Sequence, residues 1–282
     1  MIFAEAALLA LLGSIVAPAS AAPPSPAPSA TPSAAPAGPS DPCTAMSALV
    51  SRPSFSTSSC TVKPHDLLVE SGYTNTAASG RGATNTIDYP QTSLRVGVAR
   101  NLEFDLDPES YERTSTVPKT AGGSDTSLGA KYEFGYTSRF TYGVNALLTT
   151  NSGDPSFSGN GTGVLANMNA AYSASPALGF FGTAGYNAQS GGSVSAPARF
   201  HGVDPSLGAS ISLPANLTYY AEGFGQSSTA PGLGGRYGFD TGFEEDIGSR
   251  LQFDASYYDF TGAQGGMHLH SVGFGAAYLI GS

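Results

Sequence analysis

The stretch LQFDASYYDF, residues 251–260, alternates between two kinds of side chain. Leu251, Phe253 and Tyr257 fall on one face of an extended strand, and Gln252 and Asp254 fall on the other. The neighbouring runs 236–244 and 273–280 repeat this pattern, with Phe and Tyr on one face and small, polar or charged residues on the other. A soluble sandwich has a core of mostly Val, Ile and Leu. The pattern therefore indicates a barrel in lipid, apolar outside and polar inside.

The composition agrees with a membrane barrel. Charged residues make up 12% of the 282 residues, whereas Gly and Tyr number 36 and 14, which is unusual for a soluble domain. The formal net charge is -9, and Lys and Arg form no cluster in the sequence. We therefore expect no nucleic acid and no anionic membrane surface as a partner.

The first 42 residues have the composition of a leader and a spacer. An apolar run over 6–16 is followed by Ala19-Ser20-Ala21, which has the small-x-small form of a signal-peptidase site. The run is too short to span a bilayer, so we interpret residues 1–21 as a cleaved signal peptide. Residues 22–42 are almost all Ala, Pro and Ser and form a predicted disordered linker.

Cys43 and Cys60 are the only cysteines of the chain. In an exported protein such a pair indicates a disulfide rather than a metal or redox site. A zinc site needs more ligands than His65 can add, and we expect no metal and no cofactor. We interpret residues 43–64 as a periplasmic disulfide loop, which could pack under or into the barrel mouth.

The barrel itself is predicted over residues 65–282. About twelve alternating runs have the roughly ten residues that a tilted membrane strand needs. These runs cover residues 65–75, 89–98, 102–113, 124–136, 140–150, 161–173, 178–189, 198–213, 217–226, 234–245, 251–261 and 267–280. Tight turns, such as 99–101 and 137–139, alternate with mostly longer loops, such as 76–88 and 114–123. This alternation is typical of an antiparallel, up-and-down outer-membrane barrel, and the even strand count predicts that both termini are periplasmic.

Several strand phrases resemble a known family. They are SLRVGVARNLEFDL (93–106), SLGAKYEF (127–134), PSLGASISLP (205–214), YYAEGFG (219–225) and FEEDIGSRLQFDASYYDF (243–260). They are similar to the outer-membrane family named for the meta-pathway of phenol degradation, whose members are usually described as transporters. The resemblance implies a barrel linked to the uptake of small, often aromatic, compounds. The chain differs from the usual barrel ending, because the aromatic residue nearest to its end is Tyr278.

The alternation also assigns the charged side chains of the lumen. The predicted lumen-lining candidates for selectivity are Glu70, Arg95, Glu103, Asp105, Lys131, Glu133, Glu222, Arg236, Asp240, Glu244 and Asp254. Acidic groups outnumber basic ones, which favours cations if water fills the lumen. The alternative is a structural network that fills a narrow barrel. In that network Glu103 and Glu133 pair with Arg95 and Lys131, and a second group of acids, namely Glu222, Asp240 and Asp254, pairs with Arg236.

The function classes that remain are a channel or transporter for small solutes, a closed structural or surface-interaction barrel, and an outer-membrane lipid hydrolase. For the hydrolase, the candidate side chains are His268, His270, Ser256 and Ser271. No orienting partner has a convincing spacing, so we predict no catalytic residues. We expect a bacterial outer-membrane protein whose partners are lipid and lipopolysaccharide, the barrel-assembly machinery and a small-molecule solute.

Overall fold

The computed structural model describes residues 41–79, 84–115, 119–193, 195–262 and 268–281. The predicted signal peptide over 1–21 and most of the predicted linker over 22–42 lie outside these residues. Within the described ranges, no helix has the length and apolar character needed to cross a bilayer. The elements are η1 (Pro42–Thr44), α1 (Met46–Leu49), β1 (Leu67–Ser79), β2 (Thr84–Tyr89), β3 (Ser93–Ala99), β4 (Leu102–Asp107), β5 (Tyr111–Thr114), β6 (Thr120–Gly123), β7 (Ser127–Tyr136), β8 (Phe140–Thr149), β9 (Gly163–Ser175), β10 (Leu178–Ser193), β11 (Ala196–Leu213), η2 (Pro214–Asn216), β12 (Leu217–Gln226), β13 (Arg236–Ile247), β14 (Leu251–Gly262) and β15 (His268–Ile280).

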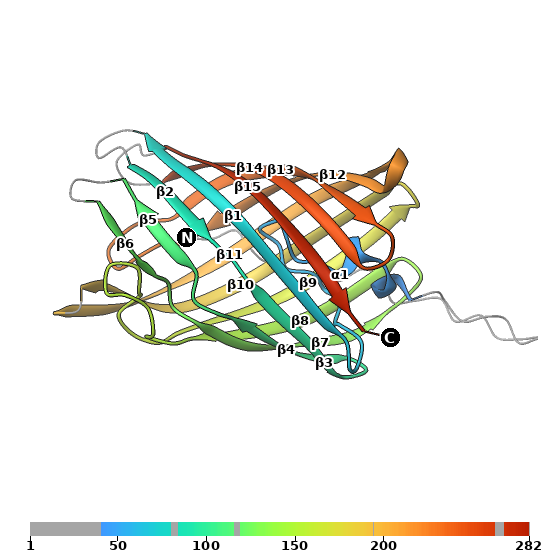
Figure 1. The fold of residues 1–282 in the computed structure, drawn as a ribbon, viewed down its shortest axis with the longest axis horizontal. Coiled ribbons are helices and arrows are strands. Elements are labelled where there is room, and N and C mark those ends of the chain that lie inside the picture. The colour runs from blue at the N-terminus through green and yellow to red at the C-terminus, as the bar shows by residue number, and fades with distance from the viewer. Residues whose placement is uncertain (1–40, 80–83, 116–118, 194, 263–267, 282) are drawn as a thin grey trace, which may run out of the picture. The chain divides into compact units, whose positions relative to one another are not determined.

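The strands form one closed antiparallel barrel. The first and last strands pair along their whole length, from Leu67 opposite Ile280 to Ser79 opposite His268. Figure 1 shows β1 and β15 side by side at this seam. Three strands of the barrel are each interrupted once, as β2/β3, β4/β5 and β6/β7, so the barrel has 12 strands. The predicted antiparallel, up-and-down barrel is confirmed.

The short turns gather at one rim of the barrel, together with the start of β1 and the end of β15. One of these turns contains Gly248, whose φ of 68° is a left-handed conformation that glycine adopts without steric cost. The longer connections lie at the other rim. We call the two ends the short-turn rim and the long-loop rim.

The strands extend further toward the long-loop rim than the sequence predicts. The predicted loop over 76–88 is wrong in part, since β1 continues to Ser79 and β2 begins at Thr84. The predicted loop over 114–123 contains β6, and residues 190–197 contain the ends of β10 and β11. These extensions are rich in Thr, Ser, Gly and Asn on both faces. They therefore lack the alternation of apolar and polar residues that identified the strands below them.

The two faces of the strands differ as the alternation predicts. On β14, Phe253 is 46% exposed, whereas its neighbour Gln252 is fully buried at 0%. On β13, Phe239 is 49% exposed and Asp240 is again at 0%. Apolar side chains thus cover the outer surface, and polar side chains fill the interior.

Residues 43–64, which we name the plug, lie inside the barrel (Figure 1). The predicted disulfide between Cys43 and Cys60 is present and ties the two ends of the plug together. Between them, α1 contributes Met46 and Leu49 to a small apolar core that also contains Val62. Barrel residues of β1 and β15 complete this core. The segment predicted as a periplasmic loop is therefore a packed unit within the barrel.

Inward-facing glycines leave the space that the plug occupies. Gly72 and Gly275 face each other across the β1–β15 seam, and a Cβ atom on either would collide with the guanidinium of Arg52. A Cβ on Gly97 would meet the backbone of the plug at Lys63 in the same way. Glycine is required at these positions because the plug approaches the barrel wall so closely.

Candidate functional site

The plug follows the inner wall of the barrel and bonds to one strand after another. It begins at β1, where the N–H groups of Ser51 and Arg52 donate to the carboxylate of Glu70 at 3.1–3.3 Å. On β14, the hydroxyl of Tyr258 donates to the carbonyl oxygen of Pro53. Wall carboxylates and hydroxyls thus satisfy plug backbone groups that water would otherwise bind.

The next anchor is Glu222 on β12. Its carboxylate accepts hydrogen bonds from the N–H of Phe55 at 2.8 Å and from the N–H of Ser56 at 3.2 Å. The hydroxyl of Ser56 donates to the same carboxylate. The ring of Phe55 stacks on Phe224 with ring centroids 4.4 Å apart. Because three donors converge on one buried charge, this anchor is strong.

The plug then returns to its starting point along β10, β8, β7 and β4. The N–H of Thr57 donates to Thr183 at 3.1 Å, and the Ser59 hydroxyl lies 2.6 Å from that of Thr141. Two further wall carboxylates accept plug N–H groups. The acceptors and donors are Glu133 with Thr61 at 3.3 Å and Glu103 with Val62 at 2.6 Å. The plug is therefore fastened around the whole inner circumference.

A buried ionic network holds the plug at its centre. The guanidinium of Arg95 on β3 lies 2.7 Å from Glu70 and 2.9 Å from Glu103. It also donates to the carbonyl oxygens of Leu49 at 2.6 Å and Cys60 at 3.1 Å. Lys131 pairs with Glu103 at 3.1 Å. One arginine thus joins two wall carboxylates to both sides of the plug, and its charge is fully compensated.

Every predicted lumen residue lies on the inner face, but the pairing differs in part from the predicted network. Arg95 and Lys131 pair with Glu103 as expected. Glu133 bonds to the plug instead, because its carboxylate reaches the backbone of Thr61. In this way the plug takes the place of the expected partner side chain.

The predicted pairing of Arg236 with a second group of acidic residues is wrong. Arg236 pairs with none of its three expected carboxylates among the described residues. Glu222 holds the plug, Asp240 accepts the hydroxyl of Tyr220 at 3.2 Å, and Asp254 pairs with Arg52 of the plug at 3.4 Å. Asp105 is buried beside the Arg95 network, and Glu244 is half-buried near the short-turn rim.

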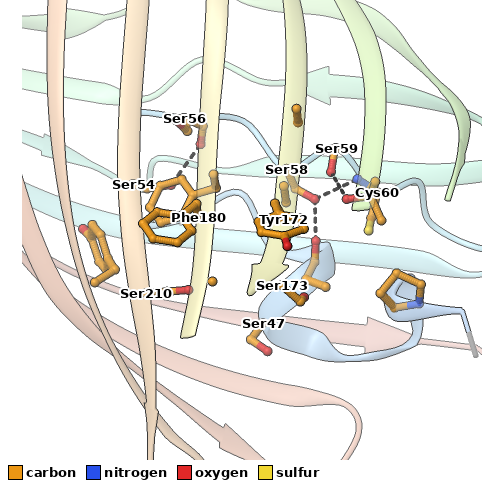
Figure 2. A pocket seen from close by; sticks show the side chains of 18 of the residues that line it. Ser47, Ser54, Ser56, Ser58, Ser59, Cys60, Tyr172, Ser173, Phe180 and Ser210 are labelled. Atoms are coloured by element: carbon orange, nitrogen blue, oxygen red, sulfur yellow. Dashed lines mark hydrogen bonds between the residues drawn. The ribbon is translucent and has the colours of Figure 1, made fainter. Parts of the chain in front are cut away.

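Cavities lie on both sides of the plug. Toward the short-turn rim, a cavity of about 230 Å³ is lined mainly by hydroxyl groups. Figure 2 shows Ser47, Ser54 and Ser58 of the plug around it, with Ser173 and Ser210 of the wall. Toward the long-loop rim lie cavities of about 420, 390 and 210 Å³.

Thr57 lines the short-turn cavity and the two larger cavities on the other side. Ser54 likewise lines the short-turn cavity and the largest cavity on the long-loop side, so these two plug residues border cavities on both sides. The N–H of Thr57 bonds to the wall, and its neighbours Phe55 and Ser59 are held there too.

The sequence places the 43–64 disulfide loop under or in the barrel mouth, but it did not identify the plug residues that bond to the wall or an amide ladder on the wall. Asn169 donates to Asn145 at 2.8 Å, and Thr183 donates to Asn169 at 2.9 Å. These side chains occupy inward positions of β8, β9 and β10. The sequence signal for this ladder is the presence of uncharged amide side chains at alternate positions. The predicted lumen residues are all charged and therefore do not include them.

The candidate hydrolase side chains do not meet. Ser256 lines a cavity inside the barrel, whereas His270 is exposed and bonds to Tyr257 and Asp259. Ser271 is buried and accepts a hydrogen bond from Thr76. The barrel wall thus separates the serines from His270, which cannot act on them as a base.

A closed antiparallel barrel with an apolar outer surface and a polar interior is the fold of outer-membrane β-barrels. No family model and no curated protein matches the sequence. Solved structures do match the fold. An outer-membrane channel from Pseudomonas putida F1 superimposes with a TM-score of 0.64 and 11% identity, over 78% of this chain and 97% of that one.

Two further similar structures have different roles. The NanC porin matches with a TM-score of 0.51 and 13% identity, over 75% of this chain and 98% of that one. The β domain of the Bordetella autotransporter BrkA matches with a TM-score of 0.50 and 12% identity, over 77% and 99% of the two chains. At these identities the likeness shows the fold, and function has to be argued from the lumen.

Proposed function

We propose that the protein is a channel of the bacterial outer membrane that passes small solutes, with the plug as its constriction. The observation that carries this proposal is the pair of cavities on the two sides of the plug, which share Ser54 and Thr57 as a wall. A purely structural barrel needs no such space on both sides of its filling. The strand phrases that resemble the phenol meta-pathway family agree with the proposal.

In this proposal both termini face the periplasm, because the barrel begins and ends at the short-turn rim, where Leu67 of β1 lies opposite Ile280 of β15. The apolar outer surface contacts outer-membrane lipid and lipopolysaccharide, and the barrel-assembly machinery inserts the exported chain. The plug then belongs to the periplasmic half of the channel.

The largest cavity on the long-loop side supports a preference for cations. Its lining contains five carboxylates and three basic side chains. These are Glu70, Asp88, Asp105, Asp107 and Asp125, with Arg52, Arg95 and Lys131. Excess carboxylate groups in a narrow aqueous path attract cations and repel anions.

Single-channel recording tests the proposal. The mature chain is refolded into a planar bilayer, and the current is measured under a potassium chloride gradient. We expect small discrete steps with a cation-selective reversal potential. Silence from a chain that shows the heat-modifiable gel mobility of a folded barrel would reject a channel.

The second candidate is a closed barrel that acts through its surface. The circumferential bonding of the plug favours it, because so many anchors oppose displacement of the plug. The same recording separates the two candidates, since a closed barrel carries no current at any gradient.

A further inference from the structure

The smallest cavity on the long-loop side, about 210 Å³, differs from its neighbours in charge. The guanidinium groups of Arg52 and Arg236 both line it, and no carboxylate is among its lining residues in the described part of the chain. The adjacent larger cavity carries an excess of carboxylates. The lumen therefore contains a locally basic chamber beside an acidic one.

Arg236 on β13 has unused hydrogen-bonding capacity. Its Nε donates to the side-chain oxygen of Gln226, and its Cζ lies 5.0 Å from the ring centroid of Phe260. Within the described ranges, no carboxylate lies at salt-bridge distance, and neither terminal nitrogen has a hydrogen-bond acceptor. Two adjacent N–H donors in one plane match the two oxygens of a carboxylate.

Arg52 supplies the second positive charge from the plug. It is held by long contacts, 3.4 Å to Asp254 and 3.4 Å to Gln91, over the seat formed by Gly72 and Gly275. Its charge is partly compensated by Asp254, and the charge of Arg236 is partly compensated by Asp204, which lines an adjoining cavity together with Arg236. Neither carboxylate is among the residues that line the chamber, whereas both guanidinium groups are.

Aromatic rings form the remaining wall. Phe55, Tyr258 and Phe260 line the chamber, and the last two have ring centroids 6.3 Å apart. Phe224 supports them, at 4.4 Å from Phe55 and 5.5 Å from Phe260. Flat apolar walls beside a guanidinium suit a solute with a flat ring and one anionic group.

We propose that this chamber binds a small monocyclic organic carboxylate on its way through the lumen. The carboxylate bonds to Arg236 with the charge of Arg52 nearby, and the ring lies against Phe55 and Phe260. The volume is below the roughly 300–1,000 Å³ of pockets for drug-sized ligands, which restricts the site to a single ring. This inference rests on the proposed channel function and names a solute class for it. The acidic cavity favours small inorganic cations, whereas the two guanidinium groups of the chamber provide a separate place for an organic anion.

Calorimetry on the full mature chain, refolded in detergent, tests the site. The probe is benzoate, compared with benzyl alcohol, which keeps the ring without the charge, and acetate, which keeps the charge without the ring. We expect saturable benzoate binding and much weaker binding of both comparators. Equal binding of benzyl alcohol and benzoate would overturn the role of the guanidinium groups.

Variants locate the binding. Arg236→Gln should weaken benzoate binding roughly tenfold or more, since it removes a partly buried charged partner. Arg250→Gln, in an exposed short turn, is the matched control and should bind as the parent does. Arg236→Lys keeps the charge without the planar fork and should still bind more weakly than the parent. Unchanged benzoate affinity in folded Arg236→Gln and Arg236→Lys would overturn the site.

The binding test of this site and the conductance test of the channel can give different results. Conductance without benzoate binding would reject this site and leave the channel standing. Benzoate binding without conductance would reject the channel and support a barrel that holds its ligand.

Discussion

Ser56 is bound to Glu222 through both its backbone N–H, at 3.2 Å, and its hydroxyl group. The two residues are 166 positions apart in the chain. One belongs to the plug and the other to the wall, so this contact is one of the anchors that hold the plug in the lumen.

We expect Glu222→Ala to loosen the plug and raise the single-channel conductance. Each hydrogen bond to a charged group contributes about 1.5–3 kcal/mol, and the variant removes those of Phe55 and Ser56. Glu245→Ala, on the exposed outer face of β13, is the control. If Glu222→Ala folds and conducts as the parent does, this anchor does not restrain the plug.

Arg95→Met should destabilise the whole barrel. It leaves Glu70 as a buried charge without a basic partner and Glu103 with Lys131 alone, and loss of one partner of a buried ion pair typically costs about 3–5 kcal/mol. The denaturant midpoint, followed by tyrosine fluorescence, measures the loss. Arg100→Met in an exposed turn should leave the midpoint unchanged.

A second substitution distinguishes charge from packing in that network. Adding Glu70→Gln to Arg95→Met should restore part of the stability, because it removes the buried negative charge whose basic partner was Arg95. A double variant less stable than Arg95→Met would show that lost packing, rather than unpaired charge, dominates.

Gly275→Ala should displace Arg52 from its seat, because a Cβ there collides with the guanidinium. We expect faster amide hydrogen exchange over residues 51–56. Gly223→Ala is the matched strand glycine, since its nearest neighbouring atom, the carbonyl oxygen of Gly238, lies 4.0 Å from an added Cβ. Equal exchange in both variants would argue against the seat.

Removal of the disulfide by Cys43→Ser and Cys60→Ser should free the plug without unfolding the barrel. The bridge closes a loop with a sequence separation of 17, and loops of about that size are stabilised by about 3 kcal/mol. We expect proteinase K to cleave within residues 43–60 while the barrel keeps its gel mobility. Resistance equal to that of the parent would show that the wall contacts alone hold the plug.

The barrel was predictable because alternation is a local property. Phe253 and Gln252 carry opposite characters, and the structure places them on opposite faces. The extensions at the long-loop rim were missed for the same reason, since TNTI at 84–87 and TAGG at 120–123 carry no such contrast. Strand pairing there is set by the strands already formed below.

The cysteine pair predicted a disulfide loop at the barrel mouth, but the contacts of the plug with the wall could not be predicted from local patterns. Residues 51–62 contain mostly Ser, Thr and Pro, a composition typical of a loop, and their partners lie up to about 200 positions away, as with Arg52 and Asp254. The predicted partners of Arg236 were wrong for the same reason. Alternation assigned it to the lumen but could not show that the plug binds two of its expected carboxylates, Glu222 and Asp254.

Because the guanidinium of Arg52 fits against Gly72 and Gly275, the sequences of the plug and the wall are coupled at these three positions. Any larger side chain at either glycine has to be matched by a smaller one at residue 52. Homologues should therefore vary at these positions together, and a plug moved into a foreign barrel of the same size should find no place for its arginine.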